Sequence, residues 1–395
     1  MNNHHSTRGL VSLRTLSVPR SSVQGMKFSA NREDLLEGLL QVQNVVSTRT
    51  TLPILGNVLI ETTEAGIQLT TTDLEVGMQC FVPATIQDPG ATTLPVKRLT
   101  SIVRELAEEQ VEFETDERCV STITCSGSVF RIVGLSDEDF PPLPPLGSGQ
   151  QFKIPQRRLR EILKQTSYAI STDENRYVLN GLLFHIQSDK LTVVATDGRR
   201  LALAEHEIQW SGEELTKVIL PAKAVHELER VLGSEGDVEV FVMAPEIAFD
   251  LDGTLLISKL IEGQFPNFQQ VVPSDSSVRV TINRMELLQA LRRVSLLLND
   301  RNLSVNMTFT RDRMRIETNS PEIGEAKDEI PVRCDADELK VSFNPIYLMD
   351  PLRQLDVDDV TLEISDYTSP GVLRTNSMNF LYVLMPMRYR AAEDE

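Results

Sequence analysis

Apolar and polar positions follow an order along the chain that repeats three times. In each copy a short alternating run, which predicts a strand, passes into a stretch with apolar residues at helical spacing. The alternating runs start at Phe28, Phe152 and Val280. A regular interval of about 125 residues indicates a domain that has been duplicated twice.

Two further features recur in each copy. Two β-rich runs separated by a polar turn predict a hairpin, at residues 57–61 and 67–73 in the first copy. Another strand then leads into a second helix, marked in the first copy by Leu99, Ile102 and Leu106. Further strands close each copy. This order predicts an α+β fold in which a pair of helices packs on antiparallel sheets.

A proline- and glycine-rich segment at 140–149 and a second linker at 272–277 join the copies. We therefore expect three domains, at residues 26–149, 150–275 and 276–395, the last ending in an acidic tail.

Residues 1–25 differ from the rest of the chain, because they carry three arginines and no acidic residue. Two interpretations stay open for this segment. It is either an organelle transit peptide or a start assigned too early, with Met26 as the true first residue. In both cases we expect a disordered extension outside the fold.

Composition narrows the classes of function. The 395 residues include 39 Lys and Arg against 57 Asp and Glu, a net charge of −18, which disfavours tight electrostatic binding of nucleic acid or of an anionic membrane. The four cysteines have neither disulfide-scaffold nor zinc-ligand spacing, so we expect reduced thiols in the cytoplasm. The charge is uneven: the predicted helices together carry about +3, and the rest of 26–395 is strongly acidic.

Familiar catalytic motifs are missing from the sequence. It contains no phosphate-binding glycine loop, no paired-histidine metal motif and no serine nucleophile elbow, so no cofactor and no metal are expected. The most catalytic-looking string is 195–201, in which Asp197 is a candidate base and Arg199 and Arg200 a candidate anion clamp. A structural turn is the alternative interpretation, because the equivalent positions of the other copies also end a hairpin strand.

Six short strings, taken in order, resemble the bacterial DNA polymerase III beta subunit family, the sliding clamps. They lie at 51–57, 72–75, 176–181, 195–202, 263–268 and 382–388. The resemblance covers residues 26–389 and implies three tandem clamp domains in a head-to-tail homodimeric ring. It also implies the function of a DNA sliding clamp, a processivity factor that encircles duplex DNA without regard to sequence and has no catalytic activity of its own.

The resemblance further implies a pocket between the second and third domains for short linear motifs. Its partners would be the DNA polymerase III alpha subunit, the clamp loader, and other DNA polymerases and repair proteins. Gly198 would permit a tight turn in this pocket, and Arg200 would supply backbone-directed hydrogen bonds. The lining would be Leu179, Thr196, Gly198, Arg199, Arg200, Leu201, Pro266, Val271, Asn344, Tyr347, Ser369, Pro370, Val383, Leu384, Met385, Pro386, Met387 and Arg388.

Two more sets of positions follow from the resemblance. The matching DNA-facing residues are Arg49, Arg176 and Lys223, and the predicted helices add Arg157, Arg158, Arg160, Lys164, Arg284, Arg292 and Arg293. The dimer interface would join Phe130 and Ile132 of one chain to Leu296 and Leu297 of the other. The competing interpretations are an enzyme that binds a phosphate compound through Asp197, Arg199 and Arg200, and an adaptor protein that forms no ring.

Overall fold

The computed structural model describes residues 25–46, 52–147, 149–212, 215–273, 278–299, 303–335, 338–377 and 379–388. The expectations for residues 1–24 and for the acidic tail at 390–395 lie outside this described part. Within it the predicted α+β order is confirmed, because each sequence repeat contributes two helices and eight strands to the described chain.

The chain divides into two compact units, and each contains one 12-stranded sheet. Unit 1 comprises residues 1–157 and 226–260, and unit 2 comprises 158–225 and 261–395. The division runs through the second repeat, whose strands are shared between the two sheets.

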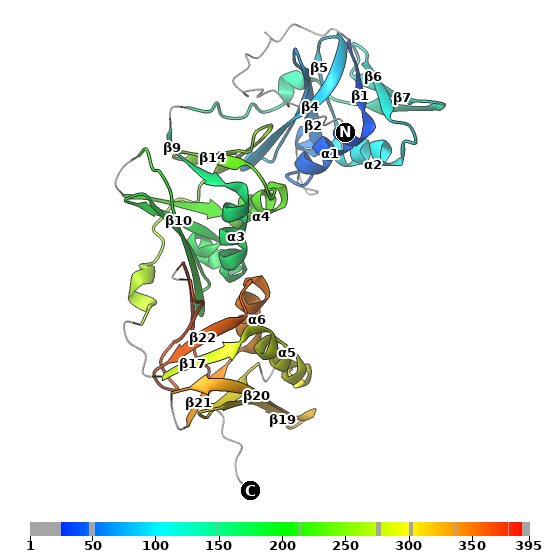
Figure 1. The fold of residues 1–395 in the computed structure, drawn as a ribbon. Helices are drawn as coiled ribbons and strands as arrows, with labels where there is room; N and C mark the ends of the chain where they lie inside the picture. Colours follow the sequence, from blue (N-terminus) through cyan, green and yellow to red (C-terminus); the bar gives the residue numbers. More distant parts are fainter. Residues whose placement is uncertain are drawn as a thin grey trace, which may run out of the picture. The chain divides into compact units, whose positions relative to one another are not determined.

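The sheet of unit 1 runs in the order β8-β7-β6-β1-β4-β16-β15-β14-β9, with β3, β2 and β5 continuing beside β4 (Figure 1). Its strands are β1 (Met26–Asn31), β2 (Asn57–Thr62), β3 (Gly66–Thr72), β4 (Val76–Asp88), β5 (Ala91–Pro95), β6 (Gln110–Thr115), β7 (Val120–Cys125), β8 (Ser128–Val133), β9 (Gln150–Pro155), β14 (Asp237–Met243), β15 (Glu246–Asp250) and β16 (Thr254–Lys259). Helices α1 (Arg32–Val42) and α2 (Val96–Glu105) pack against each other, and α1 also packs on β3 and β4.

The sheet of unit 2 runs in the order β13-β10-β11-β12-β24-β23-β22-β17-β20-β19-β18-β21. Its strands are β10 (Gly181–Gln187), β11 (Lys190–Thr196), β12 (Arg200–Glu207), β13 (Leu215–Pro221), β17 (Val278–Asn283), β18 (Val305–Phe309), β19 (Arg313–Ser320), β20 (Gly324–Cys334), β21 (Leu339–Phe343), β22 (Asp359–Ile364), β23 (Gly371–Arg374) and β24 (Phe380–Leu384). Helices α5 (Arg284–Val294) and α6 (Pro345–Gln354) pack together, and α5 also packs on β19 and β20. The remaining helices, α3 (Gln156–Thr166) and α4 (Ala222–Val231), belong to the second repeat.

The first helices of the first and third repeats begin in the same way. Each follows an asparagine, and the side-chain oxygen of Asn31 or Asn283 accepts hydrogen bonds from two backbone N–H groups of the first turn. Asparagine is a favoured N-cap because its side chain satisfies donors that have no partner inside the helix. Helices α1 and α5 are both 11 residues long, so their positions can be compared one by one.

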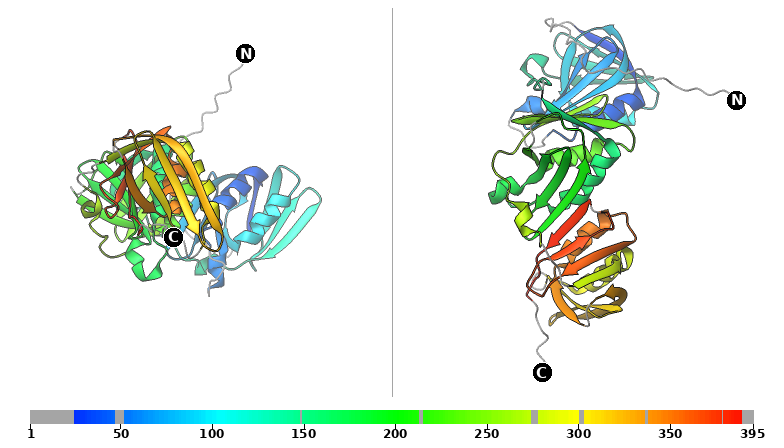
Figure 2. Two further views of the ribbon diagram at one scale, coloured as in Figure 1. Left: turned by 90° about the horizontal axis from the view of Figure 1, so that it is seen from below. Right: turned by 60° about the vertical axis from the view of Figure 1, so that its left-hand side comes forward.

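A strand pairing joins neighbouring repeats in both units. In unit 1 the last strand of the second repeat, β16, pairs antiparallel with the first half of β4, from Val76 to Cys80. In unit 2 the last strand of the third repeat, β24, pairs in the same way with the first half of β12, from Arg200 to Ala204. In Figure 2 the red strand β24 lies beside the green strands of the second repeat. We call such a pairing, between the last strand of one repeat and the fourth strand of the preceding repeat, a seam.

Helix α1 approaches its sheet closely at Gly38, which is buried. A Cβ atom at this position would lie 2.5 Å from Cγ2 of Val82 and 3.1 Å from Cδ1 of Leu69. Val82 is branched at Cβ and almost completely buried, so it has little freedom to move away.

We therefore predict that Gly38→Ala destabilises the protein, although alanine is the better helix former by about 1 kcal/mol. Overpacking costs about 1–3 kcal/mol, so we expect a net loss that urea unfolding of the full chain will measure. The control is Ser101→Ala, at an exposed position of α2, which should stay within about 0.5 kcal/mol of the unchanged protein. A stabilised Gly38→Ala variant would contradict the close packing.

Candidate functional site

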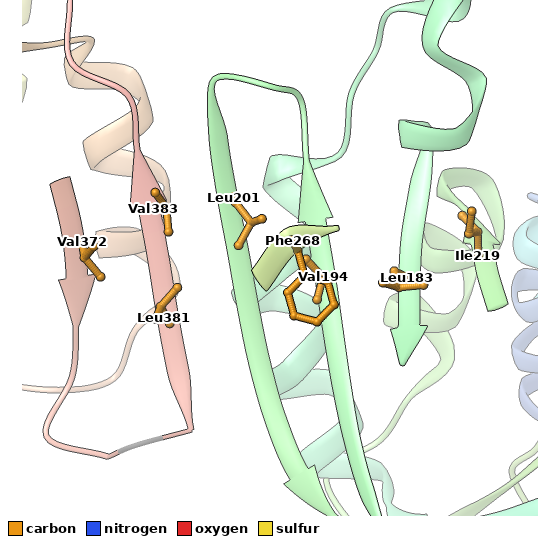
Figure 3. Packing of buried hydrophobic residues seen from close by; sticks show 8 residues of the cluster. All are labelled: Leu183, Val194, Leu201, Ile219, Phe268, Val372, Leu381 and Val383. Carbon is orange, nitrogen blue, oxygen red and sulfur yellow. The ribbon is translucent and has the colours of Figure 1, made fainter. Parts of the chain in front are cut away.

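An apolar cluster lies on one face of the sheet of unit 2, across the seam between β12 and β24 (Figure 3). Leu201 of β12 stands directly opposite Val383 of β24 in the antiparallel register. Phe268, from the segment that leads into the third repeat, packs in the same cluster. The eight buried members are Leu183, Val194, Leu201, Ile219, Phe268, Val372, Leu381 and Val383.

Several exposed apolar side chains come shortly after members of this cluster in the sequence. Met385 comes directly after β24 and is 46% exposed, and Met387 is also exposed. Val271 stands in the short helical turn after Phe268 and is likewise exposed. Single exposed apolar residues are ordinary, but several that follow a buried apolar cluster are typical of a binding surface.

The turn between β11 and β12 is held by its own side chains. Oδ1 of Asp197 accepts hydrogen bonds from the backbone N–H groups of Arg199 and Arg200, at 2.9 and 3.1 Å. The hydroxyl of Thr196 donates to the carbonyl of Arg200 and accepts from the N–H of Gly198. Gly198 has φ +84°, a conformation that side chains other than glycine rarely adopt, so the expected tight turn is present. Because its carboxylate fixes the turn, Asp197 serves here as a structural residue.

Arg200 is the centre of an ion-pair network in unit 2. Its Nε lies 3.0 Å from Asp197 Oδ2, its Nη1 lies 2.6 Å from Asp350 Oδ2, and its Nη2 donates to the carbonyl of Tyr168 at 2.6 Å. The guanidinium also lies over the ring of Tyr347, 4.4 Å from its centroid, a cation–π distance. All three nitrogens therefore bind groups of this chain, and Arg200 holds β12 to α6; its bond to the carbonyl of Tyr168 is directed to the backbone.

Two side chains, Arg200 and Tyr382, are held in fixed protonation states. Burial lowers the pKa of Arg200, but the hydrogen bond to Asp350 and the negative charge of Asp197 outweigh burial and raise the pKa above its ordinary value. Burial raises the pKa of Tyr382 well above its usual value, so its hydroxyl stays protonated and donates to the carbonyl of Tyr347 at 2.7 Å. The start of α6 and the end of β24 are thus fixed to each other.

Backbone hydrogen bonds connect further predicted pocket residues. The N–H of Met385 donates to the carbonyl of Arg199 at 3.0 Å, and the N–H of Met387 donates to the carbonyl of Ser342. Asn344 caps α6 through its side chain. The other predicted members lie elsewhere in unit 2 with mixed exposure: Leu179 and Leu384 are buried, Ser369, Pro370 and Pro386 are half-buried, and Pro266 and Arg388 are exposed.

The predicted DNA-facing residues differ in their partners and in their exposure. Four of them have these partners in this chain: Arg158 with Glu161 and His206, Arg176 with Asp173 and the carbonyl of Asp197, Arg284 with the carbonyls of Leu352 and Val357, and Arg293 with Asp328. The exposed members are Arg157, Lys164, Arg176, Arg292 and Arg293, and the half-buried members are Arg158, Arg160, Lys223 and Arg284. Arg49 lies outside the described residues.

The predicted interface residues differ in exposure. Phe130 and Ile132 of β8 line a groove of about 430 Å³ beside α2, together with Arg98 and Ile102. Leu296, just after α5, is 80% exposed, and Leu297 is half-buried. Leu296 and Leu297 thus place adjacent apolar surface at the end of α5.

No helix in the described ranges is long and apolar enough to cross a membrane.

Comparison with known proteins agrees with this architecture. The DNA polymerase III beta subunit family matches the chain three times: its N-terminal domain at residues 26–144, its central domain at 153–267 and its C-terminal domain at 269–388. The beta sliding clamp of Chlamydia pneumoniae is 36% identical over 363 residues, which cover 92% of this chain and 99% of the relative. The clamp of Escherichia coli K12 is 34% identical over 372 residues, covering 92% of this chain and 100% of the relative.

Solved structures give the same result. A sliding clamp from Bartonella birtlesii has a TM-score of 0.88 at 35% identity, covering 93% of this chain and 100% of that one. The DNA polymerase III beta subunit of Pseudomonas aeruginosa has a TM-score of 0.87 at 32% identity, covering 92% and 100%. These findings do not favour the interpretation as an enzyme acting through Asp197. The chain belongs to the DNA polymerase III beta subunit family, the sliding clamps that serve this polymerase as an accessory subunit without catalytic activity of their own.

Proposed function

We propose that two copies of this clamp close head to tail into a ring around duplex DNA in the cytoplasm, with three domains per chain at 26–149, 150–275 and 276–395. We further propose that the apolar surface around Leu201, Val383 and Met385 binds short linear motifs. The partners would be the DNA polymerase III alpha subunit, the clamp loader, and other DNA polymerases and repair proteins.

The observation that supports the ring is that two strand edges, in the first and third repeats, have no partner strand among the described residues. In both units the first half of a fourth strand pairs with the last strand of the next repeat. In the third repeat the first half of the fourth strand, β20, pairs only with β19 in the described chain. In the first repeat the last strand, β8, pairs only with β7 among the described residues.

These two unpaired edges complement each other. Open strand edges present unsatisfied N–H and C=O groups, and natural proteins cover or pair them. Pairing β8 of one copy with β20 of a second copy repeats the seam that both units already contain. With two copies, the same contact occurs twice and no edge stays open.

Apolar side chains support the same closure. Alignment of α1 with α5 makes Val45 equivalent to Leu297, and the second repeat has Ala169 at this position. Val45 and Ala169 are fully buried in the structure, whereas Leu297 is not. A second chain, with its groove beside Phe130 and Ile132, would supply the missing cover for Leu297 and Leu296.

We predict that Leu296→Glu and Leu297→Glu convert the dimer into monomers, because each substitution places a charge in the proposed apolar contact. Light scattering over a range of protein concentrations will measure the mass. Met285→Glu, at a 42% exposed position of the same helix, is the matched control and should remain dimeric. If both leucine variants stay dimeric, these residues are not in the interface.

Electrostatics alone would not hold this acidic protein on DNA. Its net charge of −18 opposes tight surface binding, and several of the candidate basic residues are engaged within the chain. Encirclement keeps the protein on DNA by topology, so that phosphate contacts can stay weak and independent of sequence. A bound clamp then raises the effective concentration of a tethered polymerase at the DNA.

We predict that protein loaded by its clamp loader is retained on nicked circular DNA in high salt and is lost when that DNA is cut once. A topological link ends at a free DNA end, whereas a surface contact is indifferent to it. Gel filtration of the DNA with labelled protein measures retention. Equal retention on circular and linear DNA would contradict encirclement and favour an adaptor that forms no ring.

The surface proposed for motif binding combines a fixed floor with adaptable edges. Leu201 and Val383 are buried in the sheet, and the Arg200 network fixes the neighbouring turn and helix. Met385 and Met387 are exposed, and methionine side chains adapt to differently shaped partners. A mainly apolar surface with a few fixed polar groups suits a short peptide with hydrophobic anchors.

We predict that Met385→Ala weakens binding of a fluorescent peptide rich in Gln, Leu and Phe by about 3- to 10-fold, the loss expected for a truncated apolar contact. Fluorescence polarisation with the full-length protein measures the affinity. Met285→Ala, a methionine of similar exposure on α5, should bind the peptide unchanged. Equal affinities for the two variants would remove Met385 from the binding surface.

A further inference from the structure

The second helix of each repeat carries an arginine at the same position. Helices α2, α4 and α6 are each 10 residues long, and their ninth residues are Arg104, Arg230 and Arg353. All three arginines therefore stand in the last turn of the corresponding helix.

Arg230 shows what this arginine does at the seam inside unit 1. Its Nη1 and Nη2 atoms donate to the carbonyls of Leu40 and Gln41, at 2.7 and 2.6 Å. These carbonyls belong to the last turn of α1, where backbone acceptors have no partner within the helix. Glu227 holds the guanidinium from the other side. The arginine of the second repeat thus caps the first helix of the preceding repeat.

The seam inside unit 2 uses a different arginine. There Arg353 pairs with Asp350 of its own helix. Arg200 instead donates a hydrogen bond to the carbonyl of Tyr168, just after α3. Arg200 is the first residue of β12, the fourth strand of its repeat. The residue just before β20 is Ile323 and the first residue of β20 is Gly324, and neither side chain has a donor. The proposed seam between β8 and β20 of two copies therefore cannot follow the pattern of unit 2.

The proposed seam between β8 and β20 does contain residues equivalent to those that form the arginine cap in unit 1. Arg104 of α2 corresponds to Arg230, and it is exposed. By the one-to-one comparison of α1 with α5, Leu40 and Gln41 correspond to Arg292 and Arg293. The negative end of a helix favours a cation beside its last carbonyls.

We propose that Arg104 of each copy caps helix α5 of the other copy, by donating to the backbone carbonyls of Arg292 and Arg293. This inference rests on the proposed ring and deepens it by naming a polar contact that positions the two chains. Arg293 is itself paired with Asp328, 2.6 Å away, and this pairing reduces its repulsion of an incoming arginine. The contact is directed to backbone atoms, so the side chains at the end of α5 do not determine it.

Two substitutions of Arg104 test the proposal. Arg104→Gln removes the charge-assisted hydrogen bonds at both seams of the ring, and we expect the dimer dissociation constant to rise about 100-fold, or about 10-fold per seam. Arg104→Lys keeps the charge but lacks the planar fork that reaches two carbonyls. We expect the lysine variant to dimerise at least about 10-fold more weakly than the unchanged protein. Mass photometry or sedimentation at low protein concentration measures these constants.

Arg230→Gln is the matched control, because it removes the same kind of contact inside a single chain. It should lower the unfolding temperature and leave the dimer dissociation constant within about 3-fold of the unchanged value. Arg104→Gln should keep its unfolding temperature when measured as a monomer, since the Arg104 side chain is exposed. A lysine variant that dimerises like the unchanged protein would overturn the capping contact and leave only a general effect of charge.

The outcomes also separate this inference from the proposed ring. If the unchanged protein is monomeric at micromolar concentration, the ring proposal fails, and the capping contact fails with it. If the protein is dimeric and dissociates with Leu296→Glu but not with Arg104→Gln, the ring stands and only the capping contact is overturned.

Discussion

Backbone pairing at the edges of strands is the constraint on which the rest of this structure depends. A strand edge inside a folded protein needs partners for its N–H and C=O groups. The chain meets this need by pairing the last strand of one repeat with the fourth strand of the repeat before it, at β4 and again at β12. Among the described residues this rule leaves one edge of β8 and one edge of the first half of β20 without a partner strand, and the proposed second chain would satisfy both.

The seam also creates the apolar surface proposed for motif binding. Antiparallel pairing puts Leu201 opposite Val383, so residues far apart in the sequence form one patch. The same pairing brings Arg200, the first residue of β12, close to Asp350 of the third repeat, while its other contact is the carbonyl of Tyr168 of the second. One line of hydrogen bonds therefore both joins two repeats and positions a surface that neither repeat contains alone.

Much of this fold could be predicted from the sequence because its signals are local. Helical spacing located α1 and α2, and the string around Asp197 indicated the turn that the structure contains. The partners of Arg200 could not be predicted, because Asp350 lies 150 residues away and only the seam brings it near. The division of the contacts into two units, which runs through the second repeat, could not be predicted either. The reason is that each seam extends a sheet from one repeat into the next, and helical or strand periodicity carries no information on pairing between repeats.

Charge acquires a different meaning once the arginines are placed. An arginine whose side chain has no partner is a candidate for phosphate binding, and this role is the one predicted for Arg158, Arg176 and Arg284 before their contacts are known. In the structure each of these donates to acceptors of its own chain, and Arg230 caps a helix. These four arginines therefore join elements of the fold through backbone carbonyls. A clamp that has to slide gains from this use, because every guanidinium committed to the fold is one fewer strong contact with the phosphates that pass it.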